Sequence, residues 1–169
     1  RTIIRLHGYR PTKLVAVKAN VSKASIRRRH LDGEIASCGA APSLQEQDIR
    51  VARLVVAQMG PEPIQKAMVE HPDFDALIVG QSHDPAPFVA ICALRDFTDL
   101  GVNYHMGKSM ECGTSCATPK SISALAIVGK EPSCFEIKPL DASSRCRVKS
   151  VAAHALYENA RPDVLYRPG

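Results

Sequence analysis

The sequence is poor in aromatic residues, which make up 5% of the chain, and it contains no tryptophan. Lysine and arginine outnumber acidic residues by 22 to 17, giving a formal charge of +5, but the basic residues are spread along the chain. Proteins that bind nucleic acid usually gather basic residues on one face and often stack bases on aromatic side chains. We therefore expect no nucleic-acid partner.

Long hydrophobic runs are also missing. No apolar run approaches the roughly 18 to 20 residues that a membrane-spanning helix needs. The first residues, RTIIRLHGYRP, lack the charged-then-apolar order of a secretory signal. We expect no membrane association and a cytoplasmic location.

Several common motifs are missing too. The six cysteines form no closely spaced disulfide framework, and 169 residues are enough to build a hydrophobic core, so we expect reduced thiols. There is no P-loop, no GxGxxG after a strand and no GxSxG elbow. These absences argue against the standard nucleotide-binding and serine-hydrolase classes.

The pattern that is present predicts a single α/β domain over residues 1–169. Short valine-rich runs predict buried strands at residues 14–19 and 76–80. Helical patterns lie between and after these strands, so we expect a crossover connection and parallel pairing. The predicted helices cover residues 22–33, 44–60, 61–71 and 87–97, with Ser22 capping the first and Cys92 facing the core of the last one.

The second half of the chain favours antiparallel structure. Residues 123–129 and 134–140 are β-like runs separated by KEPS, which indicates a hairpin. Residues 147–160 follow as a helix, in which we expect His154 to be a packed or hydrogen-bonded core histidine. The predicted fold is three-layered: a mixed, mainly parallel sheet has helices on both faces and this hairpin at its edge.

One helix prediction depends on a strong local signal. Ser43 and Glu46 have the spacing of a capping box, and apolar residues such as Ile49 and Met59 recur at helical spacing up to Gly60. The spacing predicts a long helix over residues 44–60.

Reactive side chains cluster after the strand at residues 76–80. Ligands usually bind beyond the carboxyl ends of parallel strands, where loop amides and helix N-termini converge. His83 and Asp84 would lie there and could orient a substrate or transfer a proton, although Asp84 could instead cap the next helix. We expect Gly80, Gln81 and Ser82 to contact the substrate.

A second cluster is YHMGKSMECGTSC. Lys108 and Glu111 are spaced as a helical ion pair, and Cys112 near a lysine and a helix end could be a nucleophile. We expect Lys108 and Gly113 to bind substrate and Glu111 and Cys112 to be catalytic. No cofactor is expected, but a divalent metal held by Cys112, Cys116 and a histidine stays open as an alternative.

The segments KLVAVKANVS, IRVARLVVAQMGPEP, ALIVGQSHDPAPF, HMGKSMECGTSCATP and FEIKPLDASSRCRVKSVAAHALYENARP resemble, in this order, the acyclic terpene utilisation (AtuA-like) family. HDPAPF, MECG and SVAAHALYE are the most specific parts. The resemblance implies a cytoplasmic α/β protein in the breakdown of acyclic terpenes through acyl-CoA intermediates. Members usually extend further in both directions, so the chain resembles the middle portion of the family's N-terminal domain, or one subunit of a split version.

These observations lead to three functional hypotheses. The first is an enzyme, or its pocket-bearing subunit, that acts on a small branched carboxylic acid or acyl-CoA as a hydratase or lyase. The second is a noncatalytic subunit that completes the α/β fold of a partner. The partner is either a different subunit or another copy of this chain in a homo-oligomer. The third is a metal- or cysteine-dependent amide or thioester hydrolase.

Overall fold

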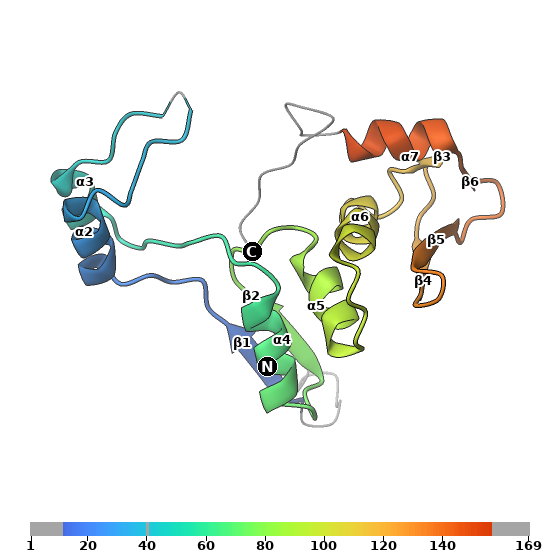
Figure 1. The fold of residues 1–169 in the computed structure, drawn as a ribbon, viewed down its shortest axis with the longest axis horizontal. Helices are drawn as coiled ribbons and strands as arrows, with labels where there is room; N and C mark the ends of the chain where they lie inside the picture. Colours follow the sequence, from blue (N-terminus) through green and yellow to red (C-terminus); the bar gives the residue numbers. More distant parts are fainter. Residues whose placement is uncertain (1–11, 40, 157–169) are drawn as a thin grey trace, which may run out of the picture.

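The computed structural model describes residues 12–39 and 41–156, and this part of the chain is a mixture of helices and short strands (Figure 1). In chain order the elements are β1 (Leu14–Val17), α2 (Lys23–Leu31), α3 (Glu46–Val51), α4 (Glu62–Glu70), β2 (Ala76–Val79), α5 (Ala86–Leu94), α6 (Leu100–Met110), β3 (Ala117–Thr118), β4 (Ala124–Gly129), β5 (Cys134–Pro139), β6 (Arg145–Cys146) and α7 (Val148–Ala155).

The strands β1 and β2 pair in parallel, as the sequence predicted, in a register that joins Leu14 to Ala76 and Val17 to Val79. One face of this pair is covered. Leu77 and Val79 pack against a small buried core from α4 and α5 that contains Ile64, Ala86 and Ala90. The crossover helix α4 begins after Pro61, because proline fits the first turn of a helix but not its interior.

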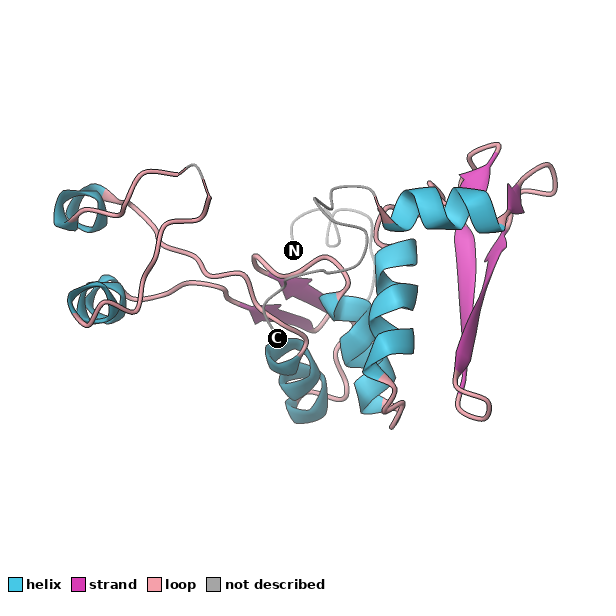
Figure 2. Cartoon of the chain, turned by 45° about the horizontal axis from the view of Figure 1, so that its top comes forward, coloured by secondary structure: helices cyan, strands magenta, loops and turns pink. Residues whose placement is uncertain are grey.

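The predicted hairpin is confirmed, but its predicted place in the fold is wrong. The strands β4 and β5 pair with each other from Ala124↔Pro139 to Gly129↔Cys134 and not with β1 or β2. The helix α6 stands between the hairpin and the β1–β2 pair (Figure 2). A hairpin on the far side of a helix cannot join the sheet on its near side.

The described residues therefore contain three two-stranded sheets, β1–β2, β3–β6 and β4–β5, rather than one. The prediction of a three-layer, mainly parallel sheet is not supported in this part of the chain. The physical reason is that the apolar side of the hairpin packs on α6, where the ring of Phe135 lies edge-on to His105 at 5.0 Å between centroids.

The long helix predicted over residues 44–60 is also wrong, because α3 ends at Val51. Its cap is formed by Gln45 and Asp48 rather than by Ser43 and Glu46. The following residues hydrogen-bond across the chain. The amide of Ala57 donates to the carbonyl of Ala19, and the amide of Met59 donates to the carbonyl of Gln81. Backbone pairing with the segments after β1 and β2 thus replaces the helix.

The helices α2 and α3 and the described residues between them lie apart from the rest of the fold, and we call residues 23–39 and 41–51 the arm (Figure 1). Ser22 caps α2 as predicted, by accepting a hydrogen bond from the amide of Ser25. Arg27 pairs with Glu46 at 2.7 Å and so connects the two helices.

Two further predictions concern the second half of the chain. Cys92 is buried in α5, which confirms its place in the core. The C-terminal helix is present as α7, although the residues predicted to extend it beyond 156 lie outside the described part. None of the helices in the described ranges has the length and apolar character required to cross a membrane.

Candidate functional site

The loop after β2 is held tightly at both ends. A side chain at Gly80 would place its Cβ 2.8 Å from the backbone nitrogen of Ala19, so only glycine allows this approach. His83 is 1% exposed, its amide donates to the carbonyl of Met59, and its ring stacks on Tyr104 with centroids 5.9 Å apart. The loop therefore presents a fixed backbone rather than a mobile one.

Asp84 lies in the same loop but is exposed. It does not cap α5, whose N-cap residue is Pro85 and has no side-chain capping bond. The alternative interpretation of Asp84 as a helix cap is therefore wrong. Gln81 and Ser82 contribute backbone contacts to Met59, through a hydrogen bond to Gln81 and a parallel bridge to Ser82.

The helix α6 brings the two predicted clusters together. Asp99 caps its start by accepting a hydrogen bond from the amide of Val102. Further along, a side chain at Gly107 would place its Cβ 2.8 Å from the Cβ of Pro85, so the helix and the loop meet in direct contact. Two of the segments on which the AtuA-like resemblance depends, those containing HDPAPF and HMGKSMECG, thus pack on each other.

Lys108 and Glu111 form an ion pair at the end of α6, which confirms the spacing-based prediction. Their side chains are only 6% and 4% exposed. Breaking a buried ion pair costs several kcal/mol, on the order of 3–5, so the contact between the two side chains stabilises this end of α6. The pair is the most deeply buried ionic contact among the described residues.

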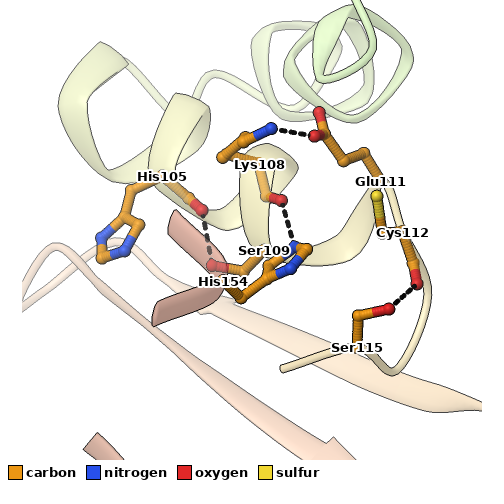
Figure 3. Close-up of polar contacts among 7 residues, drawn as sticks. All are labelled: His105, Lys108, Ser109, Glu111, Cys112, Ser115 and His154. Atoms are coloured by element: carbon orange, nitrogen blue, oxygen red, sulfur yellow. Dashed lines mark hydrogen bonds and ion pairs between the residues drawn. The ribbon is translucent and has the colours of Figure 1, made fainter. Parts of the chain in front are cut away.

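His154 of α7 contacts the end of the same helix (Figure 3). Its Nε2 lies 3.1 Å from the carbonyl oxygen of Lys108, and a carbonyl can only accept, so Nε2 carries the proton. This bond satisfies one of the carbonyls that a helix leaves without an intrahelical partner at its C-terminus. The sequence-based interpretation of His154 as a hydrogen-bonded core histidine is confirmed.

Cys112 lies just beyond the helix and is exposed. The chain turns away at Gly113, whose φ of +62° is a conformation that favours glycine. A cavity of about 710 Å³ opens beside the thiol. Its lining residues come from the turn after α6, from β3 and from α7: Cys112, Ser115, Thr118, Lys120, Ser150, Ala153 and His154.

The predicted residues thus fall into two groups. His83 and the Lys108–Glu111 pair lie in the interior, whereas Cys112 lines the cavity. Figure 3 shows the pair and Cys112 at the end of α6. No group of three or more histidine, cysteine or acidic side chains is arranged to hold a metal ion within residues 12–39 and 41–156.

Sequence reasoning missed the contributions of Tyr104, Lys120 and Cys146. Burial, with the negative charge of Glu62, raises the pKa of Tyr104, which stacks on His83. Lys120 lines the cavity beside Cys112, and Cys146 lies next to Cys116. The only signal for Cys146 was its place in FEIKPLDASSRCRVKSVAAHALYENARP, one of the segments that resemble the AtuA-like family.

No family model, curated protein or solved structure matches this chain. The AtuA-like resemblance therefore stays a prediction that depends on the sequence segments alone.

Proposed function

We propose that this chain is the pocket-bearing part of a catabolic enzyme that acts on a small branched carboxylic acid or its CoA thioester. The observation that carries the proposal is the cavity beside Cys112. It is lined by the thiol of Cys112, the ammonium group of Lys120 and the imidazole of His154. A volume of about 710 Å³ lies within the range of about 300–1,000 Å³ that small-molecule sites occupy.

The side chains suit hydration, dehydration or cleavage of a carbon–carbon bond. Lys120 would bind the carboxylate or a CoA phosphate, since an ammonium group is a strong partner for either anion. Glu111 would take or give the proton next to the carbonyl group, which requires its carboxylate to turn from the buried pair with Lys108 toward the cavity beside Cys112. His83 and Asp84 would orient the substrate from the loop that packs on α6, and Cys112 would contact the reacting end.

Turnover of a panel of acids and CoA thioesters by the full chain tests this proposal. We expect a branched enoyl-CoA to be converted faster than its straight-chain isomer. Glu111→Gln should lower kcat by about 100-fold or more, the usual effect of losing a general acid or base. Lys120→Ala should instead raise KM. Unchanged turnover in both Glu111→Gln and His83→Ala would contradict the assignment.

A control variant separates the cavity from the rest of the surface. Cys134 is exposed in β5, away from the residues that line the cavity. Cys134→Ala should keep full turnover, whereas Cys112→Ala should lower it. Equal effects of the two substitutions would show that Cys112 has no special role.

The β1–β2 pair favours a second candidate function, a noncatalytic subunit that completes a partner's fold. Ile78, on the face opposite the buried core, is 59% exposed and pairs with the exposed Ala16. Parallel sheets almost always have both faces covered. We propose that the three-layer, mainly parallel sheet forms when a second chain adds strands and covers this face.

Measuring the molecular mass in solution across concentrations tests the subunit proposal. An association that Ile78→Asp abolishes, but that the control Leu31→Asp in the arm leaves intact, would support it. An active monomer at all concentrations would contradict it.

The exposed thiol of Cys112 keeps a cysteine-dependent thioester hydrolase as a third candidate. Release of free CoA without any change in the acyl chain would identify this reaction. It should disappear in Cys112→Ala and be insensitive to a chelator, because hydrolysis through the thiol needs no metal.

A further inference from the structure

Two cysteines that no sequence motif connects lie next to each other in the fold. The Sγ atoms of Cys116 and Cys146 are 3.9 Å apart, although the residues are separated by 30 positions. Cys116 directly precedes β3, and Cys146 ends β6, which pairs with β3. The short β3–β6 ladder therefore brings the two thiols together.

The two thiols differ in their access to solvent. Cys116 is 0% exposed. Cys146 is half-buried and lines a groove of about 450 Å³ with His105, Phe135, Val148 and Val151. A small molecule can reach Cys146 from this groove, whereas Cys116 is closed off from solvent and lies against Cys146.

We propose that Cys116 and Cys146 are a dithiol site that a low-molecular-weight disulfide, such as oxidised glutathione, converts to an intramolecular disulfide. The site stands apart from the proposed enzymatic function and does not depend on it. A disulfide requires the sulfurs to come about 2 Å closer, to roughly 2.05 Å. The ladder that must adjust has only two residues in each strand, so the movement is confined to a short segment.

The reaction proceeds in two exchanges. The Cys146 sulfur first attacks oxidised glutathione, forming a mixed disulfide and releasing one glutathione thiol. The Cys116 sulfur then attacks the Cys146 sulfur, forming the internal disulfide and releasing the second glutathione. Two protein thiols are oxidised, one glutathione disulfide is reduced, and the two thiol protons leave with the two glutathione molecules.

The different environments of the thiols set this order. Burial, the charge of a neighbouring Cys146 thiolate and the hydrogen bond to Cys146 raise the pKa of Cys116 to about 11. Cys116 is therefore protonated near neutral pH and is a poor first attacker. Once Cys146 carries glutathione it can no longer be a thiolate, so one cause of the raised pKa disappears and the second exchange is favoured.

The disulfide would connect the groove at Cys146 with the segment that leads to the cavity beside Cys112. Cys146 is followed by α7, which lines both the groove and the cavity beside Cys112. Cys116 ends the turn that begins at Cys112. The disulfide would therefore fasten the turn that carries Cys112 to the start of α7.

Thiol mapping of the full chain in glutathione buffers of increasing oxidation tests the proposal. After quenching and alkylation under denaturing conditions, we expect a peptide pair linked through Cys116 and Cys146, lighter by two hydrogen atoms. Two of the six thiols should become unavailable to the alkylating reagent, and amide hydrogen exchange in β3 and β6 should slow.

Four single variants give the controls. Cys146→Ser, at a half-buried position, should abolish the linked pair without unfolding the protein, as a circular dichroism spectrum would show, and Cys116→Ser should abolish it too. Cys38→Ser and Cys134→Ser, both at exposed positions, should leave it intact. A link between Cys112 and Cys116, a stable glutathione adduct on Cys146 alone, or six free thiols at every potential would each overturn the proposal.

Discussion

The arm and the α5–α6 layer are both helical, but different forces hold them. In the layer, α5 buries apolar side chains such as Val89 and Ala90, and α6 approaches the loop before α5 at van der Waals contact. The arm has almost no core: α2 buries no residue, α3 buries only Ile49, and Leu31 is 74% exposed. Caps and surface ion pairs such as Arg27–Glu46 shape the arm.

The difference teaches that local signals are enough for a short helix here but not for a long one. Most of the stability of a protein helix comes from packing of its apolar face rather than from its intrinsic propensity. The chain after α3 finds no such surface, and it pairs with other backbone segments instead. Substitutions in the layer should therefore cost much more stability than matched substitutions at exposed positions.

The largest effect is expected at the buried ion pair. Glu111→Gln removes the buried carboxylate that pairs with the ammonium group of Lys108, and breaking a buried pair should lower the free energy of unfolding by about 3–5 kcal/mol. Urea unfolding of the purified variant measures this change. Replacing both partners by Lys108→Met with Glu111→Leu should recover much of the loss, because both charges of the pair are then removed together.

The surface pair Lys66–Glu70 is the matched control. It has helical spacing too, but its side chains are 74% and 56% exposed. Glu70→Gln should change the free energy of unfolding by only about 0–1 kcal/mol, since water and salt screen exposed pairs. Similar costs for Glu111→Gln and Glu70→Gln would contradict the burial of the Lys108–Glu111 pair.

The next effect concerns two glycines in one helix. A methyl group at Gly107 would overlap Pro85, so Gly107→Ala should destabilise the protein by about 1–3 kcal/mol despite the better helix propensity of alanine. At Gly101 the nearest atom, Asp99 Oδ1, lies 3.4 Å from the added Cβ. Gly101→Ala should stabilise the helix by up to about 1 kcal/mol. Thermal unfolding of both variants shows whether each substitution stabilises or destabilises the protein. Stability changes of the same sign would contradict the close contact between Gly107 and Pro85.

The smallest effects compare the core with the arm directly. Ile64 is fully buried, and Ile64→Val should cost about 0.5–1.5 kcal/mol through the lost methylene and the space it leaves. Leu31→Ala removes more atoms but from an exposed position, and should stay within about 0.5 kcal/mol. The denaturant midpoints of the two variants show which substitution lowers the stability more. A larger loss for Leu31→Ala would show that the arm packs against something in solution.

Sequence reasoning succeeded where neighbours along the chain determine the outcome. The Ser22 cap, the start of α4 after Pro61 and the Lys108–Glu111 pair all depend on residues within one helical turn. The parallel pairing of β1 with β2 was also predictable, because the topological rule for crossover units limits the alternatives.

It failed where distant residues compete. Glycine is unfavourable inside a helix, yet α6 runs through Gly107, where a side chain would collide with Pro85. The apolar spacing up to Gly60 predicted a helix, yet backbone pairing with Gln81 prevails. Nothing local indicates that Cys116 would meet Cys146, or that α6 would separate the hairpin from the other strands.

The close contact between Gly107 and Pro85 has a consequence for protein engineering. The two positions behave as one, because a side chain at 107 and a full ring at 85 cannot occupy the same space. A library that varies position 107 alone would sample mostly damaged proteins. Varying positions 85 and 107 together would allow exchange of volume between loop and helix, and would change the packing around the buried His83.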